Sequence, residues 1–331
     1  MSLLLLVACV GALVALAPVL AGVLGPRAGW PLAAGLAACT AGAVTIWNTG
    51  DLEQSVSWIP SLGVELSLRM DGLGLLFSLV VLGIGAVVML YSASYVTESR
   101  PLSFYTLMVF FAAAMLVLVL ADDLVLLFVA WELTTLCSYF LILRSGPDAV
   151  RPANRTLFVT AMGGLCLLAA VALIIARTGT TNLTDALASD AWTTDPAFAT
   201  TAALLVAVAA LTKSAQFPFH AWLPDAMVAP APVSAYLHAA AMVKAGIYLL
   251  LRFADAASAS PAWPVVLIGI GVLTSVMAAV FALQRTDIKE LLAYSTVSQL
   301  GMLVAIIGVG GDYAMLAACV HVVAHALFKS A

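Results

Sequence analysis

Long apolar runs separated by short polar connections cover almost the whole chain. A helix needs about 20 apolar residues to cross the hydrocarbon core of a bilayer. With the turn residues between the runs, that length predicts eleven spans. They lie near residues 2–24, 31–48, 72–95, 102–121, 123–143, 154–176, 197–217, 233–253, 263–284, 289–309 and 313–331. This pattern is typical of an all-α polytopic membrane protein.

The composition excludes several classes of function. Of the 331 residues, 64% are apolar and 9% are charged, and the mean hydropathy is +1.12. The formal net charge of -4 is spread over loops without a basic cluster, so nucleic acid is not an expected partner. The chain has no P-loop, and its five scattered cysteines show no zinc spacing, so neither a cofactor nor a metal is expected. The first apolar run lacks a basic start and is too long for a signal peptide, which favours a membrane span.

Four charged side chains lie near the middle of apolar runs: Glu132, Lys213, Lys244 and Lys329. An unpaired charge at the centre of a membrane helix costs roughly 2.5 to 3.5 kcal/mol on insertion scales. We therefore expect each of these side chains to be paired, hydrated or functional.

Two prolines follow Lys213 closely. Pro218 and Pro224 each remove a backbone donor and clash with the preceding turn, so the seventh span is predicted to break just past Lys213. Broken helices at membrane depth occur where they line a wet cavity, and they are common in transporters. A kinked packing helix is the alternative, but a kink alone does not require Gln216 and His220 beside it.

Two buried sites are candidates for proton exchange. A carboxylate such as Glu132 near a lysine can trap or release a proton, although a purely structural Glu–Lys pair is the alternative. Lys244 lies in the middle of its helix, with His238 almost two turns earlier, where its stem is too short to reach the interface. Lysines spaced in this way along the bilayer midplane can pass charge sideways.

The last apolar run places His321, His325 and Lys329 four residues apart, and therefore on one helix face. The two histidines look like half of a zinc site, but the Glu that such a motif needs after the first His is missing. A polar stripe that conducts protons fits better, because histidine titrates nearest neutral pH. Lys289, at the start of the tenth span, is either a cytoplasmic anchor or a further relay residue, and both interpretations stay open.

The basic residues of the connections indicate the orientation, because cytoplasmic loops are enriched in Lys and Arg. An N-terminus outside the cell places most of them inside. The inner residues are then Arg27, Arg100, Arg144, Arg151, Arg155, Arg285 and Lys289, against Arg69, Arg177 and Arg252 outside. The alternating pattern of residues 64–68 predicts a short exterior strand, and with it a small hairpin.

Several motifs resemble the antiporter-like subunits that respiratory complex I shares with multisubunit Mrp-type Na+/H+ antiporters. They are Met70-Asp71-Gly72-Leu73, Trp131-Glu132-Leu133-Thr134, residues 213–227 around Pro218 and Pro224, residues 231–238, Met242-Val243-Lys244-Ala245-Gly246, residues 289–296 and residues 325–329. Within that superfamily, Trp131-Glu132-Leu133-Thr134 and the lysine at position 244 most resemble the large A subunit of the Mrp antiporter.

The resemblance implies an antiporter-like fold of inverted five-helix repeats, each with a broken helix. It implies an N-terminal three-helix region with an exterior hairpin at 1–100, a complete first repeat at 101–253 and a truncated second repeat at 254–331. The chain is therefore expected to be a fragment of a longer protein.

The same resemblance implies roles for individual residues. Glu132 and Lys213 would be the charge pair of the first half-channel, and Lys244 the lysine that connects it to the second. His220 and His238 match histidines near the proton path. The second half would begin with His321, His325 and Lys329.

The expected function is that of a subunit of a multisubunit cation/proton antiporter in the cell membrane, in which proton flow through this relay is coupled to Na+ efflux. Its partners would be the other subunits, H+, Na+ and the lipid bilayer, and it would be a transporter rather than an enzyme. Two alternatives remain: the proton-pumping L-like subunit of an NADH:quinone oxidoreductase, and a scaffold that conducts nothing.

Overall fold

The computed structural model describes residues 2–50, 52–60, 64–96 and 101–330. Arg100, one of the predicted inner basic residues, lies outside them. Ten helical stretches of the described chain are long and apolar enough to cross a membrane. This confirms the all-α polytopic fold predicted from the hydrophobic pattern.

The first stretch, Leu3–Thr49, has 47 residues and contains two helices. They are α1 (Leu3–Leu24) and α2 (Gly29–Thr49), joined by the short helix η1 (Gly25–Ala28). The two helices lie side by side, because a Cβ atom on Gly35 of α2 would touch Leu13 of α1. When α1 and α2 are counted as separate spans, the ten stretches contain eleven spans, the number predicted.

A β-hairpin follows α2, as predicted. Strands β1 (Glu53–Ile59) and β2 (Val64–Arg69) are antiparallel, with Glu53 opposite Arg69. The hairpin leads into α3 (Gly72–Tyr95), whose first turn is capped by the Asp71 carboxylate, which accepts from Gly74 N at 2.7 Å. An aspartate at this position satisfies a backbone donor that has no partner within the helix.

The remaining elements form the rest of the bundle. They are α4 (Pro101–Leu120), α5 (Leu124–Leu143), η3 (Pro147–Ala149), α6 (Val150–Thr178), α7 (Leu183–Leu187), α8 (Ala191–Thr194), α9 (Pro196–Lys213), α10 (Trp222–Asp225), η4 (Ala226–Val228), α11 (Ala231–Ser234), the π-helix η5 (Ala235–Ala240), α12 (Met242–Ala257), α13 (Ala262–Leu283), α14 (Ile288–Val309) and α15 (Asp312–Ser330). Most ends agree with the predicted spans within a few residues.

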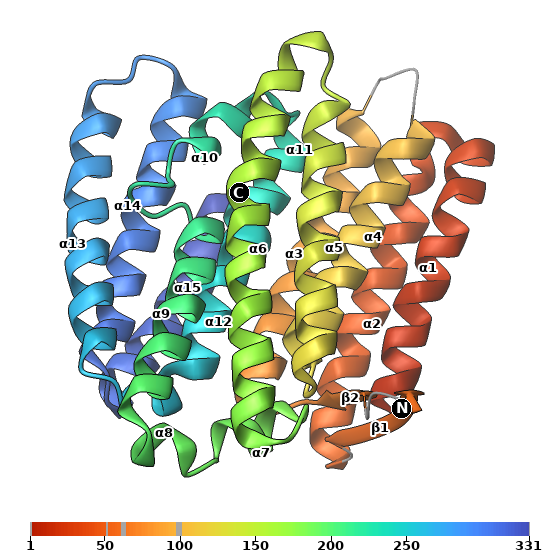
Figure 1. Cartoon of the computed structure of the whole chain (residues 1–331). Helices are drawn as coiled ribbons and strands as arrows, with labels where there is room; N and C mark the ends of the chain where they lie inside the picture. The colour runs from red at the N-terminus through yellow and green to blue at the C-terminus, as the bar shows by residue number, and fades with distance from the viewer. Residues whose placement is uncertain (1, 51, 61–63, 97–100, 331) are drawn as a thin grey trace.

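The long helices stand roughly parallel, and short elements gather at the two ends of the bundle (Figure 1). The hairpin, α7 and α8 lie at one end, whereas α10 and α11 lie towards the other. α1 and α13 form opposite edges of the view, and the helices between them enclose the polar side chains described below.

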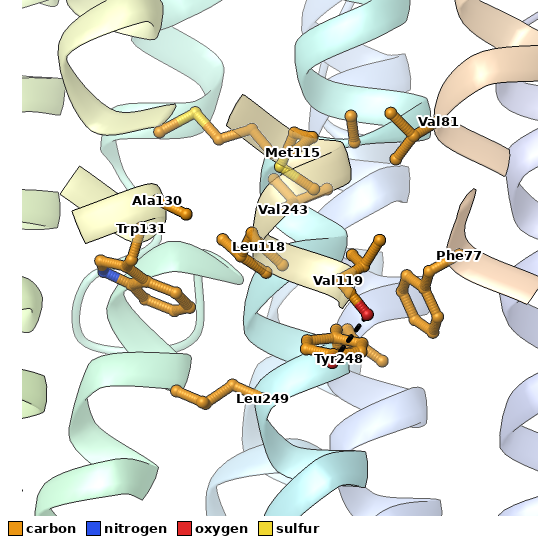
Figure 2. Packing of buried hydrophobic residues seen from close by; sticks show 14 of the residues in the cluster. Phe77, Val81, Met115, Leu118, Val119, Ala130, Trp131, Val243, Tyr248 and Leu249 are labelled. Atoms are coloured by element: carbon orange, nitrogen blue, oxygen red, sulfur yellow. Dashed lines mark hydrogen bonds between the residues drawn. The ribbon is translucent and has the colours of Figure 1, made fainter. Parts of the chain in front are cut away.

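The core is continuous through the middle of the bundle. Figure 2 shows the part where Phe77 of α3, Val119 of α4 and Tyr248 of α12 meet. The Tyr248 hydroxyl donates to Val119 O at 3.0 Å, and the Phe77 ring meets the Tyr248 ring edge-on at 5.2 Å between centroids. A buried tyrosine needs such a partner for its hydroxyl, so this bond fixes the depth of α12 relative to α4.

α13 and α14 pack unusually closely through glycine. A Cβ atom on Gly271 of α13 would lie 2.7 Å from Gly301 O, and one on Gly301 would lie 2.7 Å from Gly271 O. Small residues allow helix backbones to approach each other in membranes, where dispersion contacts rather than the hydrophobic effect hold helices together.

A partly buried ion pair connects the start of α3 to α12. The Arg252 guanidinium donates to both oxygens of the Asp71 carboxylate and, through Nε, to the Tyr248 hydroxyl at 3.1 Å. Burial alone would raise the pKa of Asp71, but the hydrogen bonds and positive charge of Arg252 hold that pKa below its ordinary value.

The ion pair predicts an acid-dependent stability. Because the pKa of Asp71 is lower in the folded protein than in the unfolded chain, the pair stabilises the fold fully above the ordinary aspartate pKa. This contribution is lost as the pH falls through the lowered pKa. Asp71→Asn keeps a capping oxygen but removes the charge, so we expect a lower thermal midpoint at neutral pH and a smaller difference from wild type in acid. Thermal unfolding of the detergent-solubilised protein across pH measures this, with the exposed Asp148→Asn as control. A constant difference at all pH values would contradict the prediction.

Candidate proton-transfer site

The break after α9 leaves backbone groups in the middle of the bundle without partners within a helix. The helix ends at Lys213, and the chain runs irregularly until α10 begins at Trp222. Ala215 adopts a left-handed conformation with φ of 53°, and the peptide bond before Pro218 is cis. Pro224, the second proline of the motif, lies within α10.

Other elements supply partners for the groups at this break. The Trp222 indole N–H donates to Thr212 O at 2.9 Å, which satisfies a carbonyl near the end of α9. The Phe217 N–H donates to the Thr274 hydroxyl of α13 at 3.0 Å. The broken segment is thereby bound both to the end of α9 and to α13.

Lys213 is completely buried, and α5 supplies its hydrogen-bond acceptors. Nζ donates to Trp131 O at 2.8 Å, to Thr134 Oγ1 at 2.6 Å and to Thr135 Oγ1 at 3.2 Å. It also lies 4.1 Å from the centre of the Trp131 ring, a distance at which an ammonium is attracted to the ring face. An ammonium has three donors, so these three oxygens on one turn of α5 satisfy it.

Glu132 lies next to this cluster without contacting the lysine directly. In the described part of the chain, it forms no ion pair with Lys213, although the two charges are close enough to interact. Its buried Oε1 atom has no hydrogen-bond partner among the described residues. The carboxylate instead lies against the backbone of Gly164 in α6. The structure thus brings the two predicted residues together but gives the ammonium other ligands.

Lys244 and His325 join α12 to α15. Both side chains are fully buried, and Lys244 Nζ lies 3.2 Å from His325 Nδ1. A charged lysine can only donate, so this contact then requires an unprotonated Nδ1 and places the ring proton on Nε2. Nε2 is buried and has no partner within the described residues. The contact is compatible with one proton shared between the two side chains. If both side chains were protonated, each would direct an N–H donor at the other and no acceptor would remain.

The other two residues of the predicted stripe lie on either side of His325 along α15. The His321 and His325 rings lie 6.3 Å apart between centroids. Lys329 turns to α14, where Nζ donates to Ser295 Oγ at 2.9 Å and to Leu292 O at 3.3 Å. The described residues contain no group of three His, Cys, Asp or Glu side chains able to hold a metal ion.

His220 and His238 lie on either side of α10. His238 is nearly fully buried on the π-helix η5, its ring 5.9 Å from that of Trp222, and neither ring nitrogen has a partner in the ranges described. His220 stacks on Phe217 with centroids 6.0 Å apart. Such a π-helical turn is found frequently at functional sites.

Lys289 differs from the buried relay residues because it is exposed at the start of α14. Its Nζ donates to Ala229 O at 3.2 Å, and it lines two cavities. One, of about 650 Å³, opens between Arg155, Asp225 and Arg285 at the end of the bundle. The other, of about 370 Å³, extends to His238 and Lys329. Lys289 thus lies on an accessible approach to the buried groups rather than among them.

The acceptors of Lys213 were not identified from the sequence. Thr134 and Thr135 stand out as hydroxyls inside an apolar run, but a helix can also satisfy such hydroxyls through its own carbonyls. Here they do both, since Thr134 Oγ1 donates to Trp131 O at 2.7 Å while it accepts from Lys213. Only the position of the Lys213 side chain, which reaches α5 from the end of α9, decides between the two uses.

A broken helix and two buried lysines inside a bundle of apolar helices characterise this polytopic membrane protein, and comparison with known proteins shows its family. Residues 121–331 match the family described as NADH:quinone oxidoreductase/Mrp antiporter, TM, and residues 58–105 match the N-terminus of chain 5 of NADH-ubiquinone oxidoreductase (complex I). The chain belongs to the NADH:quinone oxidoreductase/Mrp antiporter transmembrane family.

Individual relatives show which members of the family this chain resembles. The A subunit of the Na+/H+ antiporter of Alkalihalophilus pseudofirmus is 40% identical over 306 residues, which are 86% of this chain and 38% of that protein. The A1 subunit of the Na+/H+ antiporter of Staphylococcus aureus is 41% identical over 303 residues, with 87% and 38% covered. The chain therefore spans 38% of the length of these curated relatives.

Two solved structures share the fold. A chain of the Mrp complex from a Dietzia species has a TM-score of 0.95 and 59% identity, over 98% of this chain and 36% of that one. A chain of the membrane-bound sulfane sulfur reductase, an archaeal respiratory membrane complex, has a TM-score of 0.86 and 25% identity, over 98% and 68%. Both complexes thus contain a chain with this arrangement of helices.

The oxygen ligands of Lys213 predict a specific loss of stability. Thr134→Val preserves the shape of the side chain but removes its shortest acceptor, and an unsatisfied buried donor costs about 1 to 3 kcal/mol. We expect a lower thermal midpoint of the detergent-solubilised protein. Thr106→Val is the matched control, since that exposed hydroxyl donates only within its own helix, to Leu102 O. Equal midpoints for the two variants would contradict the assignment.

Proposed function

We propose that the chain is part of a membrane subunit of a multisubunit Na+/H+ antiporter, and that it carries protons through a line of buried and half-buried ionisable groups. The line comprises Glu132, Lys213, His220, His238, Lys244, His321, His325 and Lys329, with Lys289 at its accessible approach. The observation that supports this proposal most strongly is the complete burial of Lys213 and Lys244 at the centre of a membrane fold. A charged side chain inside a membrane is costly, so such residues are retained where function needs them. The relatives named as Na+/H+ antiporter subunits support the antiporter assignment.

The first step of the proposed mechanism concerns Lys213. As an ammonium it makes three donations to α5, but the neutral amine has only two N–H donors and must release one oxygen. Loss of the proton also removes the positive charge beside Glu132. Proton transfer at Lys213 therefore loosens the contact between α9 and α5 and changes the electrostatic field at the carboxylate.

The second step passes this change to Lys244. Gly246, two residues after Lys244, lies directly against Ala210 and Ser214 at the end of α9. A movement of Lys213 and of the end of α9 would therefore displace α12. Lys244 and His325 then exchange their shared proton, which moves the charge from α12 to α15.

The proposal assigns the parts of the chain as well. Residues 1–100 form an N-terminal region of three helices and the hairpin, 101–253 the first repeat with the broken α9, and 254–331 the start of a second repeat. The first repeat would work with other subunits of an antiporter complex, with H+ and Na+ as transported ions. The chain would have no catalytic activity of its own.

We also propose that the protein lies in the cell membrane with its N-terminus outside. The support is that the connections between α1 and α2, between α5 and α6 and between α13 and α14 lie at one end of the bundle, opposite the hairpin and α7 (Figure 1). Arg27, Arg144 and Arg285 belong to these connections, and Arg151 and Arg155 to the first turns of α6. Basic loops mark the cytoplasmic side.

A second candidate is a subunit of a redox-driven proton pump. It is favoured by the fold shared with the archaeal respiratory complex and by the complex I match at residues 58–105. The proton path would be the same, but the energy would come from an electron donor rather than an ion gradient.

Replacing either member of the first pair tests the proposed function. Lys213→Ala and Glu132→Ala in the full-length subunit should abolish Na+ uptake into everted vesicles, which corresponds to Na+ efflux from the cell, when a pH gradient drives it, while the complex still assembles. Arg177→Ala removes a cation from an exposed ion pair with Asp195, and it is the control for the loss of a positive charge. Retained efflux in both variants would refute the proposal, and efflux that requires an electron donor would favour the redox-driven pump.

The orientation has its own test. In a variant without native cysteines, Ser57→Cys in the exposed part of β1 should react with a membrane-impermeant maleimide in intact cells. Gln284→Cys, exposed between α13 and α14, should react only after permeabilisation. The reverse labelling pattern would overturn the N-out assignment.

A further inference from the structure

Two adjacent glycines, Gly163 and Gly164, are buried in the middle of α6. Neither has a positive φ, so the backbone itself does not require glycine there. Glycine destabilises a helix interior by roughly 0.5 to 1 kcal/mol relative to alanine in water. The structural reason for both lies in what they contact.

The two glycines face the two helices that carry the predicted charge pair. A Cβ atom on Gly163 would overlap the side chain of Thr212, the residue before Lys213 in α9. A Cβ atom on Gly164 would overlap Oε1 of Glu132 in α5, and its three nearest neighbours would all be atoms of that carboxyl group. α6 thus has a notch, formed by Gly164, into which the Glu132 carboxyl group fits.

Shape, rather than bonding, holds the carboxyl group in this notch. Oε1 of Glu132 is buried and has no hydrogen-bond partner in the described ranges of the chain. Lys213, the nearby cation, donates to the oxygens of α5 instead. The bare backbone of Gly164 leaves the space that this oxygen occupies.

We propose that Gly164 is a positioning residue for the proton relay: the absence of a side chain there places the Glu132 carboxyl group close to Lys213 but out of direct contact with it. This inference rests on the proposed function, because it gives Glu132 a role in transport. With a methyl group at position 164, the carboxyl group must leave the notch, and its separation from Lys213 changes.

The displaced group is the far end of a flexible side chain, so the substitution is compatible with folding. Gly246 shows the opposite case, because a Cβ atom there would meet backbone atoms of Ala210 and Ser214. Gly164→Ala is therefore expected to leave assembly intact and to act on the carboxyl group alone. Gly83→Ala is a matched control, since its Cβ atom would have only Thr40 as a neighbour, at 3.9 Å.

The experiment combines Gly164→Ala with Glu132→Asp, which shortens the side chain by one methylene group and makes room for the methyl group. In the assembled full-length complex, we expect Gly164→Ala to lower the antiport rate roughly tenfold, as small misplacements of reacting groups do, and to shift its pH profile. Glu132→Asp alone should also lower the rate. The double variant should be clearly more active than the product of the two single effects, because the substitutions compensate each other.

An infrared measurement separates this inference from the proposed function. The carboxyl stretching band of Glu132, assigned by its loss in Glu132→Gln, should shift in Gly164→Ala and stay unchanged in Gly83→Ala. If Glu132→Gln leaves antiport intact while the band shifts, the transport role of Glu132 fails but its place in the notch stands. An unshifted band, or strictly multiplicative losses in the double variant, would overturn the positioning role of Gly164.

Discussion

A buried ammonium group must find its acceptors inside the protein, and the first half of this structure is arranged around that need at Lys213. Three oxygens of a single turn of α5 meet its three protons. This arrangement requires α9 to end where it does, with the lysine at its last residue and the chain turning away at once. The break and the reach of the Lys213 side chain from α9 to α5 both belong to this contact.

The two buried lysines satisfy this requirement in different ways. Lys213 is bound by oxygens that do not titrate near neutral pH, whereas Lys244 faces an imidazole, the side chain that ordinarily does. The first site therefore holds its ammonium group with non-titrating oxygens, whereas the second places a titratable partner against the amine.

Much of this architecture could be predicted from the sequence, because apolar length and proline positions act locally. The spans, the hairpin and the end of α9 near Pro218 depend on neighbouring residues only. The ligands of Lys213 could not be predicted, since Glu132 is the carboxylate of the motif but Thr134 and Thr135 are the actual partners. The contact of Lys244 with His325, 81 residues apart, could not be predicted, because no local pattern encodes the depth at which two helices meet.

The bond from Phe217 to Thr274 carries a mechanical consequence. An amide group of the broken segment is held by a side chain of α13, so the segment cannot wind back into helix without letting go of its neighbour. Any rearrangement at the end of α9 therefore acts directly on α13. In this way the broken segment and α13 are mechanically coupled through the backbone, independently of the titrating side chains.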